Sequence, residues 1–151
     1  MLLWRILEGE TMKMGVLAVA VLVTSGSFAE AQELKKGNLV GTHVMTIKLE
    51  PGVTLEQFTA FYVDKAIPAA EKIWPGWRYY PVRRIRGEKA DGFGLLIVIP
   101  SEAERDKYYN ADGSSSELGK AAIVKFQPTL DALTKLGSIT ADPYVDWLVY
   151  R

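Results

Sequence analysis

The chain has 151 residues, of which 48% are hydrophobic and 24% charged, proportions typical of one globular domain rather than a disordered chain. Its 18 basic residues balance 18 acidic ones, which argues against a nucleic-acid-binding protein that relies on positive charge. The absence of cysteine excludes disulfides, thiolate metal sites and cysteine nucleophiles, and the single histidine excludes any site built from several histidines.

The N-terminal region, residues 1–31, predicts a cleavable secretory signal. Lys13 precedes an apolar run at 14–23, and Ala29-Glu30-Ala31 supplies a small-x-small cleavage site. The apolar run is about half the roughly 20 residues that a transmembrane helix needs, so a retained membrane anchor is the weaker alternative. Cleavage after Ala31 predicts a periplasmic or secreted protein with no stable membrane anchor.

Residues 32–39 predict a polar, flexible lead-in to a single domain at 40–151. The alternation in His43–Leu49 predicts a strand, with His43, Met45 and the following odd positions on one side. Pro51-Gly52 then breaks the chain.

A helix is predicted to begin at Thr54, because Gln57 three residues later completes a capping-box pattern. Pro68 should kink or restart this helix, and Pro75-Gly76 should end the unit. One helical face gathers five apolar or aromatic residues: Leu55, Phe58, Phe61, Tyr62 and Ala66.

Two further strands follow. Trp77–Arg86 is predicted as a strand in which Pro81 suits an edge or a bulge. Gly87–Gly92 has the composition of a turn, and the nearly continuous apolar run Phe93–Ile99 is predicted as a central, covered strand.

The C-terminal part predicts a short helix, a long helix and a strand. Ser101 and Glu104 form a second capping-box pattern, with a helix to about 109 and a flexible loop at 110–116. A longer helix is predicted from Glu117 to Leu136, interrupted by Pro128, and Tyr144–Tyr150 alternates as a last strand.

The resulting order β-α-β-β-α-β predicts an α+β, ferredoxin-like fold with a four-stranded antiparallel sheet and helices on one face. The chain offers no further element to cover the other face. A second copy packed sheet against sheet is therefore expected, which makes the protein a homodimeric α+β barrel.

Three motifs resemble the dimeric α+β barrel superfamily, most closely its stress-responsive A/B barrel (Dabb-like) family. They are the stretch His43–Thr54 with its Pro-Gly-Val turn, Pro75-Gly76-Trp77 before the second strand, and Ser101–Asp106 after the third strand. The resemblance covers roughly residues 40–151. Antibiotic-biosynthesis monooxygenase-like proteins share this architecture, so the fold alone does not choose a function.

The resemblance implies a catalytic role for His43, because a plant cyclase of this family uses a first-strand histidine together with a second histidine after the third strand. The region Tyr109–Gly119 contains no histidine, so the second position has no counterpart here. Tyr108 or Tyr109 could substitute as a hydrogen-bond donor.

The residues themselves support a ligand site only in outline. His43 is the one side chain that ordinarily titrates near neutral pH, and it could act as a base or lie half-buried at an interface. Arg84 and Arg86 share one side of their strand and Arg83 takes the other, where a guanidinium could hold a carboxylate or phosphate. The predicted ligand-binding residues are Tyr62, Trp77, Tyr80, Arg84, Tyr108 and Trp147.

Three functions remain open. The favoured one is an exported protein that binds a small apolar or aromatic molecule. The alternatives are a cofactor-free monooxygenase or cyclase-like enzyme that uses His43, and a structural or stress-related oligomer without a ligand. No spacing supports a metal site, a phosphate loop or a nucleophile elbow, so neither a metal nor a cofactor is expected.

Overall fold

The computed structural model describes residues 33–87 and 92–151, and its sheet is organised around one long strand, β1 (Leu39–Leu49). The strand β3 (Phe93–Ile99) pairs with one edge of β1, and β2 (Arg78–Arg83) pairs with the outer edge of β3. All pairings are antiparallel, in the order β2-β3-β1-β4. The predicted α+β, ferredoxin-like fold is therefore confirmed.

The other edge of β1 carries two short strands rather than one. β4 (Gly137–Ala141) pairs with the second half of β1, and β5 (Val145–Leu148) pairs with the first half. The prediction of one last strand at 144–150 missed β4, and it placed Gly137 at a helix end rather than in a strand. The backbone N–H of Asp142 donates to the Val44 carbonyl at 2.8 Å, so residues between β4 and β5 stay attached to β1.

Alternation along β1 separates two faces of the sheet, as predicted. Met45 is 6% exposed on the helix side, whereas Val44 is 45% exposed on the opposite side. β1 also begins earlier than expected, at Leu39, so the lead-in predicted for 32–39 is shorter. Asn38 is already buried, and its Nδ2 donates to the Pro100 carbonyl at 2.9 Å.

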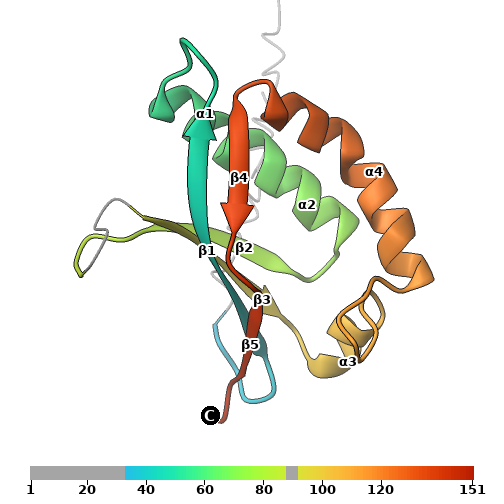
Figure 1. The fold of residues 1–151 in the computed structure, drawn as a ribbon. Helices are drawn as coiled ribbons and strands as arrows, with labels where there is room; N and C mark the ends of the chain where they lie inside the picture. Colours follow the sequence, from blue (N-terminus) through green and yellow to red (C-terminus); the bar gives the residue numbers. More distant parts are fainter. Residues whose placement is uncertain (1–32, 88–91) are drawn as a thin grey trace, which may run out of the picture. The chain divides into compact units, whose positions relative to one another are not determined.

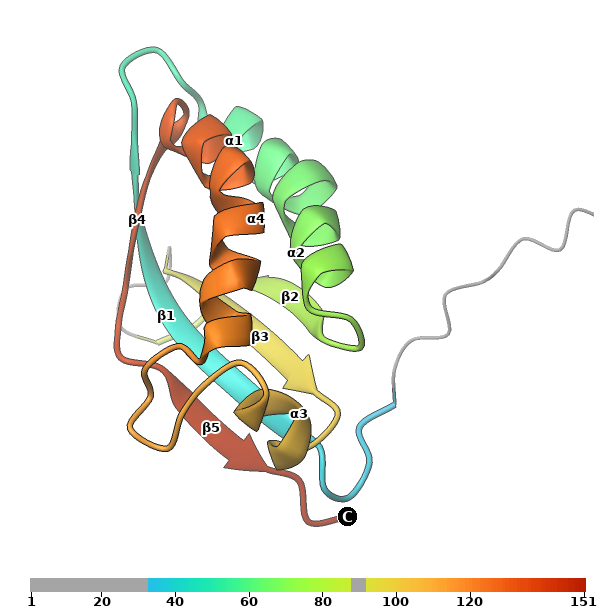
Figure 2. The same cartoon turned by 90° about the vertical axis from the view of Figure 1, so that its right-hand side faces the viewer.

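Helices cover one face of the sheet (Figures 1 and 2). The first helical segment consists of α1 (Leu55–Phe61), the π-helical turn η1 (Tyr62–Ala66) and α2 (Ile67–Ile73). The second consists of the short α3 (Glu102–Asp106) and the long α4 (Glu117–Thr134), which packs against α2 and η1.

The first segment begins and changes course where the sequence indicates. Gln57 N donates to Thr54 Oγ1 at 3.2 Å, and Thr54 N donates to Gln57 Oε1 at 2.9 Å, which confirms the capping box. Pro68 lies in the first turn of α2, directly after η1. A proline is tolerated there because the wider π turn and a new helix start need no N–H from it. Leu55, expected on the buried face, is 39% exposed.

The predicted interruption of the long helix at Pro128 is wrong, because α4 runs through it. A proline removes the hydrogen bond to the carbonyl four residues earlier, which here belongs to Val124. Val124 is 72% exposed, so water reaches this part of the helix and can satisfy the freed carbonyl.

The face of the sheet opposite the helices stays open in the described chain. β2 is an edge strand, as Pro81 suggested, and β3 is an inner one, as its apolar run predicted. Large apolar side chains lie exposed across the open face: Val44, Tyr80, Val82, Val145 and Trp147. The predicted signal at 1–31 and most of the predicted turn at 87–92 lie outside the described residues.

Candidate functional site

Three adjoining pockets lie between the sheet and the helices, in series along β1. The histidine pocket, about 510 Å³, is lined by His43, Tyr144, Asp146 and Arg105 among others. The central cavity, about 250 Å³, shares Trp77, Ile97 and Tyr109 with the histidine pocket. The arginine pocket, about 180 Å³, contains Arg83 and shares Met45, Tyr62 and Ile139 with the central cavity.

The histidine pocket depends on a close approach between Tyr144 and β1. A Cβ atom built on Gly41 would lie 2.0 Å from the Tyr144 hydroxyl oxygen, so only glycine leaves room for this ring. The Tyr144 ring then lies beside His43, with 4.9 Å between ring centroids. Burial, followed by the neighbouring Asp146 carboxylate, raises the pKa of Tyr144, so its hydroxyl stays protonated.

The contact between His43 and the backbone determines the tautomer of the imidazole. His43 Nδ1 lies 3.2 Å from the Asp142 carbonyl oxygen. A carbonyl can only accept, so Nδ1 carries the hydrogen in the neutral ring and Nε2 keeps its lone pair. The half-buried imidazole therefore offers a base on the histidine pocket.

An ion pair connects the short helix α3 with β5 at the same pocket. Arg105 Nη1 donates to Asp146 Oδ2 at 2.8 Å, and Arg105 Nη2 lies 2.8 Å from Asp106 Oδ1. The hydrogen bond to Asp146, followed by that to Asp106, raises the pKa of Arg105. Carboxylates thus bind both Nη groups of the guanidinium, which leaves Arg105 in a structural role.

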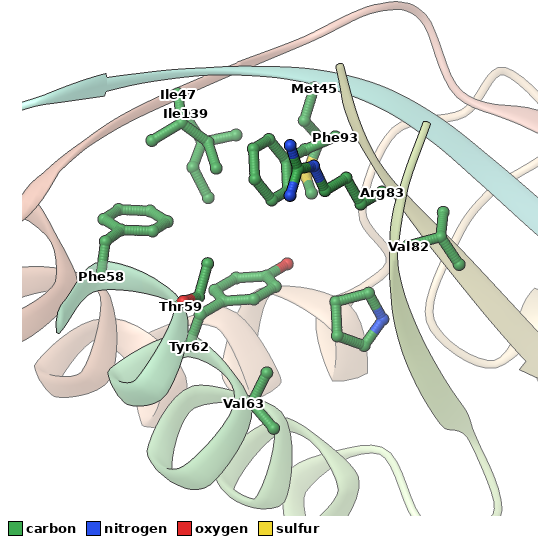
Figure 3. Close-up of a pocket in the computed structure, with 11 residues that line it drawn as sticks. Met45, Ile47, Phe58, Thr59, Tyr62, Val63, Val82, Arg83, Phe93 and Ile139 are labelled. Atoms are coloured by element: carbon green, nitrogen blue, oxygen red, sulfur yellow. The ribbon is translucent and has the colours of Figure 1, made fainter. Parts of the chain in front are cut away.

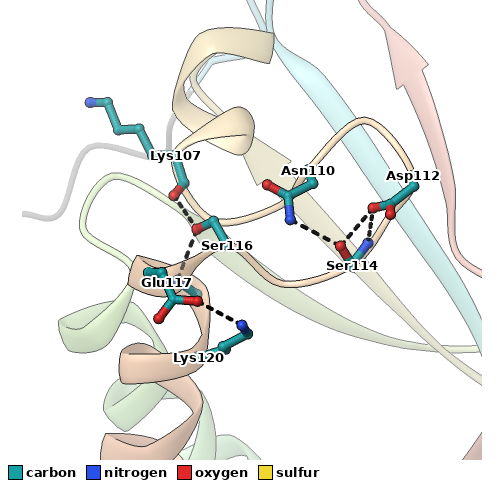
Figure 4. Close-up of polar contacts among 8 residues, drawn as sticks. Lys107, Asn110, Asp112, Ser114, Ser116, Glu117 and Lys120 are labelled. Carbon is teal, nitrogen blue, oxygen red and sulfur yellow. Dashed lines mark hydrogen bonds and ion pairs between the residues drawn. The ribbon is translucent and has the colours of Figure 1, made fainter.

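The loop after α3 supplies the rim of the histidine pocket and is held by its own polar contacts (Figure 4). Asn110 Nδ2 donates to Ser114 Oγ at 2.9 Å, and Ser114 Oγ donates to Asp112 Oδ1 at 2.6 Å. Ser116 Oγ donates to the Lys107 carbonyl at 2.6 Å and caps α4 by accepting from Gly119 N. These contacts position Asn110, Ala111 and Gly113 over the pocket.

A tight turn brings two tryptophans to the central cavity. Trp77 N donates to the Trp74 carbonyl at 3.1 Å across Pro75 and Gly76. Gly76 has a φ of 85°, which the third position of a type II turn requires. Both indoles are almost fully buried, at 7% and 3% exposed, and both pack against Tyr108.

The two buried indole N–H groups lack acceptors. Within residues 33–87 and 92–151, neither Trp74 Nε1 nor Trp77 Nε1 has a hydrogen-bond partner. An indole can only donate, and a buried donor left unpaired costs roughly 1–3 kcal/mol. Both residues line the central cavity, whose other walls are mainly aliphatic and aromatic. The cavity is thus apolar, and two residues of its lining carry an indole N–H without an acceptor.

The arginine pocket lies at the far end of the series, between α1, η1 and β2 (Figure 3). Its walls are apolar apart from Thr59, Tyr62 and Arg83. Burial raises the pKa of Tyr62 to about 12, so this hydroxyl is a neutral donor at ordinary pH.

The structure separates the predicted site residues into three groups. His43, Tyr62 and Trp77 line the pockets. Tyr80 and Trp147 instead face the open side of the sheet, at 39% and 61% exposed. Tyr108 packs beneath the tryptophans, and neither Tyr108 nor Arg84 lines the three pockets. Strand alternation explains why Tyr80 and Trp147 do not line the pockets. They are the sequence neighbours of Tyr79 and Asp146, which point to the helix side, so their own side chains point to the open side.

Several pocket residues lie outside the six predicted ligand-binding residues, although the sequence offers Tyr109 as a possible donor and Arg83 for an anion: Trp74, Tyr79, Arg83, Arg105, Tyr109, Tyr144 and Asp146. The sequence could have indicated Asp146 as a site residue, since it is a charged residue on the helix-facing side of an alternating strand. Its pairing with Arg105, 41 residues away, had none.

No three metal-ligating side chains come together within the described ranges. The described helices also include none that is long and apolar enough to cross a lipid bilayer.

Comparisons with known proteins give no family model and no curated relative that matches. Solved structures do match. SnoaB, a cofactor-independent oxygenase from Streptomyces nogalater, is 12% identical, with 76% of this chain and 95% of that chain covered and a TM-score of 0.42. A candidate antibiotic biosynthesis monooxygenase from Chloroflexus aurantiacus is 14% identical over 75% and 94% of the chains (TM-score 0.41).

A dimeric ferredoxin-like protein of unknown function from Thermobifida fusca is 15% identical, over 78% of this chain and 98% of that chain, with a TM-score of 0.35. One solved neighbour is thus named as ferredoxin-like and two as candidate antibiotic biosynthesis monooxygenases. At these identities and scores, the likeness carries no argument about activity.

The raised pKa of Tyr62 predicts a loss of stability in alkali. The folded state holds the phenol proton to about pH 12, whereas the unfolded chain releases it near the ordinary tyrosine pKa of 10.0. The contribution of the buried, neutral Tyr62 phenol to the free energy of unfolding is fully present below pH 10 and is lost as the pH rises toward 12. Tyr62→Phe should reduce the slope of unfolding free energy against pH by up to about 1.4 kcal/mol per pH unit.

Urea unfolding between pH 9 and 12 measures this slope. Tyr150→Phe, at a side chain that is 82% exposed, is the matched control. An unchanged slope in Tyr62→Phe would show that burial of this phenol does not contribute.

Proposed function

We propose that the protein binds a small, largely apolar ring compound that carries at least one hydrogen-bond-accepting oxygen. The observation that carries this proposal is that two residues lining one apolar cavity, Trp74 and Trp77, each have a buried indole N–H without an acceptor. A carbonyl or phenolic oxygen that reaches either indole would accept from a donor that the described protein leaves unpaired.

The shape and lining of the interior support a ring compound. The central cavity is bordered by Tyr62, Tyr79 and Phe126, and ring-shaped ligands suit such aromatic walls. Burial raises the pKa of Tyr79, so its phenol also remains uncharged. With no charged side chain in the lining of the central cavity, an uncharged ligand is preferred over an ion.

The ligand proposal predicts that an oxygen atom contributes to affinity. 1-Tetralone should bind more tightly than tetralin, which has the same ring system without the carbonyl. Trp77→Phe should weaken tetralone binding roughly fivefold to tenfold more than it weakens tetralin binding, because both ligands lose the same ring contacts and only tetralone loses a hydrogen bond. Isothermal titration calorimetry measures both ligands.

Trp147→Phe, on the open face of the sheet, is the matched control for the tryptophan substitution. The proposal is contradicted if tetralone and tetralin bind equally well to the native protein, or if both tryptophan variants weaken tetralone binding to the same extent.

A second function, a cofactor-free enzyme, is favoured by the tautomer of His43. Its Nε2 is free to accept a proton on the histidine pocket, next to the cavity proposed for the ring compound. Such a base could deprotonate a phenol or a carbon acid activated by a carbonyl group. Reaction of the resulting carbanion with O₂ defines a monooxygenase, and attack on a neighbouring carbonyl defines a cyclase.

Anthrone tests the enzyme proposal, because removal of a ring proton and reaction with O₂ converts it to anthraquinone and water. The native protein should accelerate O₂ uptake, and His43→Gln should lower that rate at least about a hundredfold, since glutamine cannot accept the proton. An unchanged unfolding midpoint serves as the folding control. Equal rates for the native protein and His43→Gln would exclude His43 as the base.

A second copy of the chain is the proposed cover for the open face of the sheet. The exposed Val44, Val82 and Val145 would pack against the same residues of the partner. Val44→Asp should raise the dimer dissociation constant by at least about a hundredfold, because a charge would be buried. Val124→Asp, on the exposed side of α4, is the control.

Sedimentation velocity over a dilution series measures the dissociation constant. A native protein that is monomeric at all concentrations would contradict the dimer, and so would identical behaviour of the two aspartate variants.

Two finer assignments also remain proposals. The motifs His43–Thr54 and Ser101–Asp106 support membership of the stress-responsive A/B barrel family. The pattern of residues 1–31 supports export to the periplasm or the medium. Intact-mass spectrometry of the exported fraction tests the second, and a chain that still begins at Met1 would contradict it.

A further inference from the structure

The arginine pocket has a composition that differs from the rest of the interior. It is an apolar hollow with one cation, Arg83, in its lining (Figure 3). Arg83 lies at the end of β2 and pairs in register with Phe93, so its side chain leaves the strand on the helix side. Figure 3 shows it extending across the pocket toward Phe93.

Arg83 has no protein counter-charge in the described part of the chain. The ion pairs found there involve Arg105, Lys107 and Lys120, and none reaches Arg83. Arg105 shows the contrast, because Asp106 and Asp146 occupy both sides of its guanidinium. The five N–H donors of Arg83 are thus open to a planar anion, which a carboxylate matches with two parallel hydrogen bonds.

The apolar part of the pocket determines what the anion is attached to. Phe58, which is 1% exposed, and Ile47 and Val63 contribute its walls. A volume of about 180 Å³ is below the roughly 300–1,000 Å³ of pockets for drug-sized ligands, so it suits a single ring or a short chain. The Tyr62 hydroxyl adds a neutral donor in the same lining.

We propose that the arginine pocket is a binding site for small monocarboxylic acids with an aryl or short alkyl group, in which Arg83 binds the carboxylate. The apolar group lies among Phe58, Tyr62 and Phe93, and the carboxylate stays at the rim, where the guanidinium is still reached by water. This site goes beyond the proposed ring-compound function, because it uses neither His43 nor the tryptophans.

The probe pair 3-phenylpropionate and 3-phenylpropionamide tests the site, since the two molecules have nearly the same shape and differ in charge. The native protein should bind the acid at least about tenfold more tightly than the amide, as charge-assisted hydrogen bonds are stronger than neutral ones. Arg83→Gln should reduce acid binding to the level of the amide. Arg83→Lys should retain part of the preference, because the charge remains and the fork is lost.

Arg86→Gln is the matched control: it removes the same charge three residues away, at a side chain that is exposed like Arg83 but does not line this pocket. Acid binding should be unchanged in it. Methyl NMR spectra locate the ligand, because Ile47 and Val63 line the arginine pocket alone whereas Ile97 lines the other two. The acid should shift the first two signals and not the third.

Three results would overturn the proposal: no measurable binding of the acid, equal affinity for acid and amide, or the same loss of acid binding in Arg83→Gln and Arg86→Gln. The last would mean general electrostatic attraction rather than a site. Failure here leaves the tetralone experiment untouched, so the two proposals stand or fall separately.

Discussion

The histidine pocket, the central cavity and the arginine pocket all depend on the pairing of β1 on both of its edges. Antiparallel bonds to β3 on one side, and to β4 and β5 on the other, hold this strand in a single register. Because side chains alternate along a strand, that register alone directs His43 and Met45 toward the helices and Val44 toward the open face. A slip by one residue would exchange the two faces and remove the site together with the core.

Residues that are far apart in the sequence come into contact along the edge of β1 that pairs with β4 and β5. Gly41 has no side chain, and the Tyr144 ring fills the space that results. The same strand edge brings the Asp142 carbonyl to His43, so backbone that connects β4 with β5 decides which imidazole nitrogen is basic. The break between β4 and β5 leaves the Asp142 carbonyl oxygen to accept from His43. In an unbroken antiparallel ladder, this oxygen would accept from a backbone N–H of β1 instead.

The sequence was sufficient for those features that arise from local patterns. The Thr54–Gln57 capping box, the covered strand Phe93–Ile99 and the two faces of β1 follow from spacing within a few residues. The division of the last strand could not be predicted, because Gly137–Ala141 has weak strand propensity and forms only through pairing with β1. The site was predicted in part. Along β2 and β5, Tyr79 and Asp146 face the helices, whereas Tyr80 and Trp147 face the open side of the sheet. Which of the alternating residues face the helices is known only once the pairing of the strands is known.

The π-helical turn Tyr62–Ala66 has a consequence for insertions and deletions in this chain. A π turn is equivalent to one extra residue inside an α-helix, so the segments before and after it differ in phase from a regular helix by about 100°. That offset allows Phe58 and Ala70 both to be buried against the same sheet. Loss of a single residue from the turn would restore an ordinary helix and keep Phe58 and Ala70 on the sheet side, whereas loss of a residue within α1 or α2 would rotate one of them away by about 100°. The packing of this segment is thus more sensitive to a deletion in either helix than to one in the turn.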